Sequence, residues 1–474
     1  MQEYKIYIGG EFCTTSTKLK VFNPFDNSIV AETYLAGKDE LEKSIGKAQL
    51  VKSIMHDLSS HKKYTILMQI ANQLEAKSSE LALILACEAG KPLKYALGEI
   101  NRAIQVFTVA AEESKRLPKE YISIDWTAAG EKKEGLVNYF PVGLIAGIAP
   151  FNFPLNLAAH KIAPAIASGN AIIMKPARST PLSVLELAKI IDQTELPKGA
   201  FSVLPMDREA GNQLVTDERF NMLSFTGSPN VGWKMKANAG KKKITLELGG
   251  NAGVIVSEQA DIDLAIKKCL AGGFAYSGQV CIHVQRIIIH EKVFNTFVDE
   301  FISGAQKFIF GAPDDEATDI SVMIDKKNAK RVEDWVMEAV NDGAEILYGG
   351  KRKGSFFEPT IITNTKPEMK VCALEIFGPV VTVEKFSEFS QAIDMINDSE
   401  YGLQAGVFTN SIIEMNQSFN ELKVGGVIIN DVPTFRVDHM PYGGIKNSGF
   451  GREGVKYAIQ EMMEPRLLVK NTNY

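Results

Sequence analysis

Apolar runs of strand length alternate with helix-length segments through the middle of the chain. The runs are Val142–Ala149, Ala171–Lys175, Ala200–Leu204, Met222–Phe225 and Ile244–Leu248, and the segments between them are Leu155–Ser168, Thr180–Gln193, Glu209–Thr216 and Pro229–Ala239. Strands that are buried on both faces are continuously apolar, and parallel strands are joined by right-handed crossovers. The pattern therefore predicts a doubly wound parallel sheet, whose ligands bind at the carboxyl ends of its strands.

A second alternation of the same kind follows. Its first strands are Asn251–Val256 and Val284–His290, its first helices are Asp261–Tyr276 and Lys292–Phe308, and it continues to Val427–Asn430 before the glycine-rich loop Tyr442–Gly451. The predicted fold class is α/β, with two open doubly wound α/β domains and a small additional β element.

The flanking segments carry other patterns. Tyr4–Phe12 alternates around a Gly-Gly turn and predicts a hairpin, while Asp39–Ala89 and Leu93–Arg116 have helical patterns. Tyr121–Tyr139 is short, mixed and polar, which is typical of a hairpin that leaves its domain to make a subunit contact. The tail Arg466–Val469 is strand-like and could pair with another chain.

Composition narrows the class of protein. The chain has 474 residues, with 45% hydrophobic and 23% charged residues, which suits two or three domains of a soluble globular protein. A formal net charge of −5 without a long single-sign block argues against a nucleic-acid partner and a polybasic membrane patch. The first residues lack the apolar core of a signal peptide, so a cytoplasmic location is expected.

Cysteine and histidine usage argues against metal sites and disulfides. The five cysteines are widely spaced without a CxxC pair, and the six histidines lack the spacing of metal ligands. These features predict no metal and a reducing compartment.

One cysteine differs from the others in its setting. Cys281 follows a Gly-Gln turn, where Gly278 lets the backbone come close and the neighbouring side chains add little bulk. A nucleophilic thiol needs such access and surroundings that favour the thiolate. The alternative is a small buried hydrophobic residue. That is the interpretation for the others, Cys13, Cys87, Cys269 on an apolar helix face and Cys372 in a strand-like run.

Two further residues stand where catalytic groups are expected. Glu247 ends an apolar strand before Gly-Gly, where partial burial would raise its pKa toward the range of a general base. An edge-strand glutamate facing water is the alternative. Asn152, within Pro150-Phe-Asn-Phe-Pro154, can donate its amide to a developing oxyanion or simply cap the following helix.

Three other motifs could hold a nucleotide. Lys175 and Arg178 end the second strand and could contact ribose or phosphate, or form surface salt bridges. Ser228 lies in a strand–turn–helix segment whose helix N-terminus suits a pyrophosphate, although the chain has no GxGxxG. Glu375 and Phe377 precede a Gly-Pro turn, where a nicotinamide contact and a plain turn are both open.

In combination the motifs are specific. PFNFP, KPA, FTGS, LELGG, GQVC, EIFGP and PYGGIKNSG occur in one order, and the chain resembles the aldehyde dehydrogenase superfamily over essentially its full length. It looks most like the branch of lactaldehyde and succinate-semialdehyde dehydrogenases. The resemblance implies a Rossmann-like NAD(P)-binding domain at 1–120 and 140–248, a catalytic domain at 249–449, and an oligomerisation element at 121–139 and 450–474.

The resemblance also implies roles at matching positions. Cys281 would attack the aldehyde, Asn152 and the Cys281 N–H would hold the oxygen, and Glu247 would activate water to release the acid. The implied coenzyme-binding residues are Pro150, Lys175, Arg178, Ser228, Glu375 and Phe377. The implied partners are a small-molecule aldehyde and further copies of the chain, as a homodimer or homotetramer.

Two arginines bear on specificity. NAD-preferring members commonly have Glu where this chain has Arg178, and a cation there favours the 2′-phosphate of NADP, so NADP is the expected coenzyme with NAD as the alternative. Arg436 could anchor a substrate carboxylate, or pair with Asp438 or Asp431. His283 is not expected to be a catalytic base. The alternative functions are a CoA-acylating semialdehyde dehydrogenase and a catalytically silent structural relative.

Overall fold

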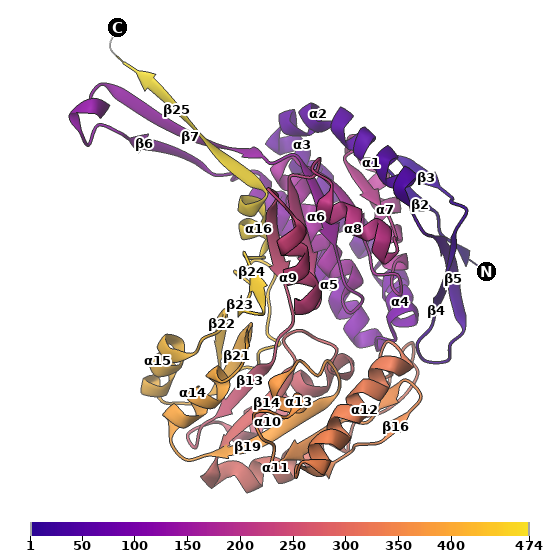
Figure 1. The fold of residues 1–474 in the computed structure, drawn as a ribbon, viewed down its shortest axis with the longest axis vertical. Helices are drawn as coiled ribbons and strands as arrows, with labels where there is room; N and C mark the ends of the chain where they lie inside the picture. The colour runs from indigo at the N-terminus through magenta and orange to yellow at the C-terminus, as the bar shows by residue number, and fades with distance from the viewer. Residues whose placement is uncertain (1, 473–474) are drawn as a thin grey trace.

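The structure is a computed structural model that describes residues 2–472. Two α/β bodies lie one above the other in Figure 1, and a narrow arm projects from the upper body. The chain forms the upper body first, crosses to the lower body after β12, and returns near its C-terminus through β24 and α16.

The upper body is built on an eight-stranded sheet with the order β24-β12-β11-β8-β9-β10-β2-β3. The five central strands, β12, β11, β8, β9 and β10, are parallel to one another. The outer strands pair antiparallel, with β24 on one side and β2 and β3 on the other. Their bounds are β2 Ile6–Ile8, β3 Glu11–Cys13, β8 Leu144–Ile148, β9 Ala171–Lys175, β10 Phe201–Val203, β11 Met222–Thr226, β12 Lys243–Glu247 and β24 Gly449–Phe450. The parallel strands are almost wholly buried, which explains their continuous apolar runs.

Helices cover both faces of this sheet. On one face a core joins it to α3 (Ser60–Ala76), α4 (Ser78–Ala89), α5 (Leu93–Ser114), α6 (Pro154–Ser168), α7 (Leu182–Asp192) and α16 (Val455–Glu461). On the other face a second core joins it to α1 (Lys38–Leu50), α8 (Arg208–Thr216) and α9 (Pro229–Asn238). Both faces are therefore wound, as the sequence pattern predicts.

The lower body repeats the plan with a seven-stranded sheet in the order β15-β18-β19-β14-β13-β21-β22. Only β15 pairs antiparallel among these strands. The strand bounds are β13 Ala252–Val256, β14 Val284–His290, β15 Glu345–Tyr348, β18 Thr360–Thr363, β19 Val380–Phe386, β21 Gln404–Phe408 and β22 Gly426–Ile429. The helices are α10 Ile262–Phe274, α11 Glu291–Ala305, α12 Lys326–Asn341, α13 Lys370–Ala373, α14 Phe389–Asn397 and α15 Ile412–Glu421.

The arm is a separate three-stranded sheet. Strands β6 (Lys119–Ser123) and β7 (Lys133–Pro141) form the predicted hairpin, and β25 (Met463–Asn471) pairs with β7. Figure 1 shows these strands leaving the upper body with the C-terminus at their far end. Nine positions of β25 pair with β7 of the same chain. Because β25 is the outer strand of this sheet, the expectation that the tail could pair with another chain stays a prediction for its other side.

Two local predictions also needed correction. The helical stretch Asp39–Ala89 is broken into α1, α2 (Lys52–Asp57), α3 and α4. The break before α3 comes from the extended residue Leu58 and from Ser59, whose side chain caps the new helix. Cys372 lies in the short helix α13 rather than in a strand.

Smaller elements complete the fold. A three-stranded sheet of β1 (Gln2–Glu3), β5 (Ile29–Tyr34) and β4 (Lys18–Phe22) flanks the upper body. Short pairs join β16 (Arg352–Lys353) to β17 (Phe356–Phe357) and β20 (Tyr401–Gly402) to β23 (Ile445–Lys446). Among residues 2–472, no helix combines the length and the apolar character needed to cross a membrane.

Candidate active site

The strand ends of the upper sheet bring most of the predicted residues together. In the sheet register Ile148 pairs with Lys175, Ile148 also with Phe225, and Thr226 with Glu247. The motifs that follow these strands therefore lie together at the carboxyl ends of the strands, which we call the sheet edge below. This is the edge at which parallel α/β sheets bind ligands.

A cavity of about 470 Å³ opens at this edge and reaches into the lower body. Its lining includes the predicted residues Pro150, Asn152, Ser228, Glu247, Cys281, Glu375 and Phe377. These residues come from five separate segments of the sequence. Their meeting in one cavity is the central geometric result of the structure.

Cys281 follows a turn that is fixed rather than flexible. Tyr276, Ser277 and Gly278 have positive φ angles of 49°, 52° and 68°, and a β-carbon at Gly278 would overlap the main-chain oxygen of Gly378. Ser277 donates to the oxygen of Ser321 at 2.8 Å, and Gln279 accepts the N–H of Ile324 at 2.9 Å. The turn is thus locked against the segment that carries Phe377.

The thiol of Cys281 is half-buried and has one polar neighbour in the described chain. Its Sγ lies 3.2 Å from the hydroxyl oxygen of Tyr442. Burial raises the pKa of Cys281 to about 11, while the hydrogen bond to Tyr442 and the charge of Arg436 act in the lowering direction. The expected thiolate-favouring surroundings are therefore only partly present, and the resting group is a thiol.

Asn152 is buried at the turn between β8 and α6. Its side-chain amide donates to the main-chain oxygen of Gln279 at 2.9 Å, which places it beside the Cys281 turn. Phe153, rather than Asn152, occupies the N-cap position of α6. The helix-cap alternative for Asn152 is therefore wrong.

A buried ion pair supports this turn. Lys91 pairs with Glu99 and also donates to the main-chain oxygen of Asn152 at 2.6 Å. Glu99 in turn accepts the N–H groups of Leu155 and Asn156 at 2.9 and 3.1 Å. Sequence reasoning missed both charged residues, because Lys91 lies in a short Gly-Lys-Pro connection between two helices and Glu99 in an ordinary helical pattern.

Glu247 is buried at the end of β12, so the edge-strand alternative is wrong. Neither carboxylate oxygen has a hydrogen-bond partner within residues 2–472. Burial, followed by the nearby charge of Glu453, raises the pKa of Glu247 well above its ordinary value. A carboxylate whose pKa is raised is a stronger base than an ordinary carboxylate, so in its ionised form Glu247 can accept a proton from water.

The cavity also offers groups that fit a dinucleotide. Ser228 is the N-cap of α9 but its side chain makes no capping bond in the described structure, so the helix N-terminus is open to a phosphate. Glu375 accepts the N–H of Gly250 at 3.1 Å, and burial raises its pKa to about 7. Phe377 packs edge-on against Phe151 at 5.9 Å between ring centroids.

Comparison with known proteins decides the family. The aldehyde dehydrogenase family model matches residues 12–468. The chain belongs to the aldehyde dehydrogenase family. It is 43% identical to 3-sulfolactaldehyde dehydrogenase of Priestia aryabhattai, over 99% of this chain and 98% of that protein. It is 40% identical to lactaldehyde dehydrogenase of Methanococcus aeolicus, over 98% and 100% of the two chains.

Solved structures agree. Aldehyde dehydrogenase 21 of Physcomitrella patens, in complex with the reaction product succinate, matches with a TM-score of 0.98 and 42% identity, over 100% of this chain and 99% of that one. Glyceraldehyde-3-phosphate dehydrogenase GapN of Methanocaldococcus jannaschii, complexed with NADP, matches with a TM-score of 0.92 and 40% identity, over 96% and 99%. The predicted fold class, the enzyme class and the use of NADP or NAD are confirmed.

Lys175 and Arg178 lie along the same sheet edge but outside the lining of the cavity around Cys281. Lys175 packs against α8 near Gly211, and burial, with the charge of Arg178 next, lowers its pKa. Arg178 is exposed, and no ion pair within residues 2–472 includes it, so the salt-bridge alternative does not hold for it. In this aldehyde dehydrogenase it is a free cation next to Lys175.

Arg436 is buried, and the prediction that it could pair with Asp438 or Asp431 was wrong. It pairs with Glu453 at 3.2 Å, while Asp438 pairs with Arg102 and His160, and Asp431 with Lys268. Its guanidinium lies over the Tyr442 ring, with 3.6 Å between Cζ and the ring centroid. Arg436 is thus one aromatic ring away from the Cys281 thiol.

His283, as expected, is not placed to act as a base. Its Nε2 lies 2.8 Å from the main-chain oxygen of Gly273, and burial lowers its pKa to about 4. Its ring is therefore neutral, and its Nε2 is used in a hydrogen bond to the main chain of α10.

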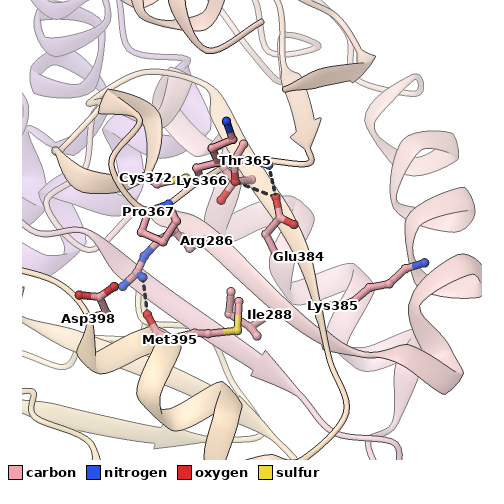
Figure 2. Close-up of a pocket in the computed structure, with 11 residues that line it drawn as sticks. Arg286, Ile288, Thr365, Lys366, Pro367, Cys372, Glu384, Lys385, Met395 and Asp398 are labelled. Atoms are coloured by element: carbon pink, nitrogen blue, oxygen red, sulfur yellow. Dashed lines mark hydrogen bonds between the residues drawn. The ribbon is translucent and has the colours of Figure 1, made fainter. Parts of the chain in front are cut away.

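A second cavity, of about 150 Å³, lies in the lower body beside α13 (Figure 2). Arg286 of β14 donates to the oxygens of Met395 and Ile396 in the last turn of α14, at 2.7 and 3.1 Å. Glu384 accepts both the N–H and the hydroxyl of Thr365 at 2.7 Å, and burial raises its pKa. These bonds tie α14 and the segment before α13 to the sheet, which is a structural role.

Proposed function

We propose that Cys281 attacks the carbonyl carbon of an aldehyde and that the resulting thioester is hydrolysed to a carboxylic acid. The observation that carries this proposal is the meeting of Cys281, Asn152 and Glu247 in one cavity. The Sγ–carbon bond forms as the carbonyl oxygen gains negative charge. A covalent thiol intermediate divides one difficult oxidation into two easier steps.

Asn152 would stabilise the charged oxygen. One of its two amide hydrogens is bound to Gln279, which fixes the direction of the other. The N–H of Cys281 would be the second donor. Because both donors belong to turns held in place by buried hydrogen bonds, they need no reorganisation as the charge develops.

Glu247 would act after the oxidation. It would take a proton from water as the water oxygen attacks the thioester carbon, and the acid would leave as the sulfur regains a proton. Both carboxylate oxygens of Glu247 are buried and lack a hydrogen-bond partner in the described chain, so either oxygen could accept a hydrogen bond from such a water. A CoA-acylating enzyme does not need this base, so the hydrolytic reaction is the better supported.

The coenzyme would lie along the sheet edge. When bound, the dinucleotide accepts the hydride of the substrate. Ser228 and the α9 N-terminus would hold the pyrophosphate, Lys175 the adenosine ribose, and Glu375 the nicotinamide ribose, with Pro150 and Phe377 as apolar walls. The free cation at Arg178 supports a preference for NADP, because it suits a 2′-phosphate.

The substrate would be a short hydroxyaldehyde or an aldehyde with a distal anion. Lactaldehyde, 3-sulfolactaldehyde and succinate semialdehyde are the candidates, since the relatives are named for the first two and one solved relative holds succinate. Arg436 would attract the distal anion. Its place one ring beyond the thiol supports this role, although Glu453 already occupies one of its nitrogens.

The arm would be the main element of assembly in a homodimer or homotetramer. Tyr121, Trp126 and Leu467 are 69%, 86% and 51% exposed on it. A small sheet without a packed face is only marginally stable in water, which supports a covering partner. The proposed division keeps the coenzyme domain at 1–120 and 140–248, the catalytic domain at 249–449, and the oligomerisation element at 121–139 and 450–474.

A substrate panel tests the function. We expect NADPH to form with lactaldehyde, 3-sulfolactaldehyde or succinate semialdehyde faster than with unsubstituted alkanals, without added CoA, and not at all in Cys281→Ser. NADPH formation that requires CoA would favour the acylating reaction. Equal rates on anionic aldehydes for wild type and Arg436→Ala would remove the proposed anchor.

A further inference from the structure

The phenol of Tyr442 is the polar group that touches the proposed nucleophile. Its hydroxyl oxygen lies 3.2 Å from Sγ of Cys281, and the residue is 3% exposed. Tyr442 comes from the glycine-rich loop near the C-terminus, 161 positions away from Cys281 in sequence. The sequence motifs gave this loop no chemical role.

Main-chain and side-chain contacts fix the phenol in place. Tyr442 and Glu453 exchange main-chain hydrogen bonds of 3.0 and 2.7 Å across an isolated β-bridge. The ring packs in a small apolar cluster with Ile282 and Leu403. The guanidinium of Arg436 lies over the ring at 3.6 Å from the centroid, which is a close cation–π contact.

The charge above the ring is held by other buried charges. Arg436 pairs with Glu453 at 3.2 Å, and Glu453 also pairs with Lys161 at 3.0 Å. Lys161 reaches the hydroxyl of Thr226, which lines the cavity, at 2.8 Å. All three charged side chains are at most 4% exposed. Asp438, which pairs with Arg102 and His160, and the buried carboxyl of Glu247 are the other acidic groups near Arg436. Arg436 is the cation that contacts the Tyr442 ring itself.

The surroundings of the Cys281 sulfur act in opposite directions. Burial raises its pKa most, and the carboxyls of Glu375 and Glu247 add to that effect. The Tyr442 hydrogen bond and the Arg436 charge oppose it. Burial also raises the pKa of Tyr442 well above its usual value, so the phenol keeps its proton and can donate it to a thiolate.

We propose that the Tyr442 hydroxyl is a catalytic hydrogen-bond donor to the Cys281 thiolate, and that Arg436, clamped by Glu453, is the positioning residue that holds the phenol and a positive charge beside it. The proposal rests on the nucleophilic role proposed above for Cys281. Under this proposal the glycine-rich loop near the C-terminus takes part in the chemistry of the thiol instead of only packing against it.

The test is the pH dependence of Cys281 alkylation by iodoacetamide in the full-length enzyme without aldehyde. Tyr442→Phe removes only the hydroxyl. We expect its alkylation midpoint to rise by about one pH unit, and its rate at neutral pH to fall about tenfold. An unchanged profile would overturn the proposal. Because Cys13, Cys87 and Cys372 are also half-buried, peptide mass spectrometry assigns the modified residue.

A second variant tests the positioning role. Arg436→Lys keeps a cation but not the planar group over the ring, so its midpoint is expected to rise by less than that of Tyr442→Phe. A larger rise would overturn the assignment of Arg436. Aldehyde is absent, so the substrate anchor proposed for Arg436 does not affect the result.

The two proposals fail in different ways. If Cys281→Ser still produces NADPH, the nucleophilic mechanism is wrong whatever the alkylation shows. If Cys281→Ser is inactive but Tyr442→Phe keeps the wild-type alkylation profile, the mechanism stands and the role of Tyr442 is wrong.

Discussion

The ammonium group of Lys91 donates to the main-chain oxygen of Asn152 across 2.6 Å while it is paired with Glu99 in the protein interior. Glu99 binds the main chain on the other side of the same turn, at Leu155 and Asn156. One buried ion pair therefore fixes both ends of the segment that carries the proposed oxyanion donor. Its contribution to stability and to catalysis can be measured together.

We expect Lys91→Met to lower the free energy of unfolding by about 3–5 kcal/mol, because it leaves Glu99 as a buried charge without its cation. The turnover number should fall as well, since Asn152 loses a main-chain contact. Denaturant unfolding and steady-state kinetics measure the two effects. The double variant Lys91→Met/Glu99→Gln should recover part of the stability, because no unpaired charge remains.

Lys94, three residues after Lys91 and in the first turn of α5, provides the matched control. Its pair with Asp319 is partly exposed, with 43% and 27% of the two side chains accessible. Lys94→Met should change stability by less than about 1 kcal/mol. Equal effects of Lys91→Met and Lys94→Met would show that burial of the first pair has no special role.

Coenzyme preference should follow the charge at position 178. Arg178→Gln removes the attraction to a 2′-phosphate, and Arg178→Glu adds a repulsion. We expect kcat/KM for NADP to fall in that order, by about tenfold to a hundredfold for the glutamate, while kcat/KM for NAD changes little. A preference between NADP and NAD that is the same in all three proteins would contradict the role of Arg178.

The buried carboxylate Glu453 should make the fold sensitive to acid. Burial alone would raise its pKa, but Lys161, His160 and Arg436 hold that pKa below its usual range. The stabilisation is thus present above the ordinary carboxyl pKa and is lost as the pH falls below it.

Urea unfolding from about pH 6 to about pH 3 measures this effect. Glu453→Gln should lose less free energy of unfolding than the wild type over that range, although it is less stable at the upper end. The exposed Glu464 on β25 supplies the control, and Glu464→Gln should follow the wild-type slope. Parallel slopes for wild type and Glu453→Gln would contradict the charge assignment.

Assembly should depend on the arm. Strand β25 provides one outer side of the three-stranded sheet, so deleting residues 463–474 exposes β7 and removes three apolar side chains, Leu467, Leu468 and Val469. Gel filtration with light scattering should show a smaller oligomer for the deletion. The single substitution Trp126→Ser changes one exposed side chain between β6 and β7 and leaves the strands intact, so it tests that side chain separately from the sheet. If the deletion keeps the wild-type mass, assembly uses another surface.

The sequence predicted best those features that depend on local pattern. Strand β14 has the predicted bounds Val284–His290, because seven successive residues are buried. Gly278 was singled out for its backbone, and its positive φ and close approach to Gly378 explain why. The order of the motifs was enough to identify the superfamily.

The features that sequence reasoning missed depend on contacts between distant segments. Lys161 and Glu453 are 292 positions apart, and Tyr442 reaches Cys281 across 161. Buried charges of this kind lie in helices and loops whose local pattern is ordinary. For the same reason Arg436 was paired with its sequence neighbours, while the folded chain gives it Glu453 from another turn.

The central claim is that Cys281 carries the acyl group of the substrate. The most direct measurement is mass spectrometry of Glu247→Gln after mixing with NADP and lactaldehyde or 3-sulfolactaldehyde. Without the proposed base, the thioester should accumulate, and the acyl group should be found on the peptide that contains Cys281. The same treatment should leave Cys281→Ser unmodified. Wild-type oxidation of the aldehyde, with no acyl group on Cys281 in Glu247→Gln at any time, would contradict the mechanism.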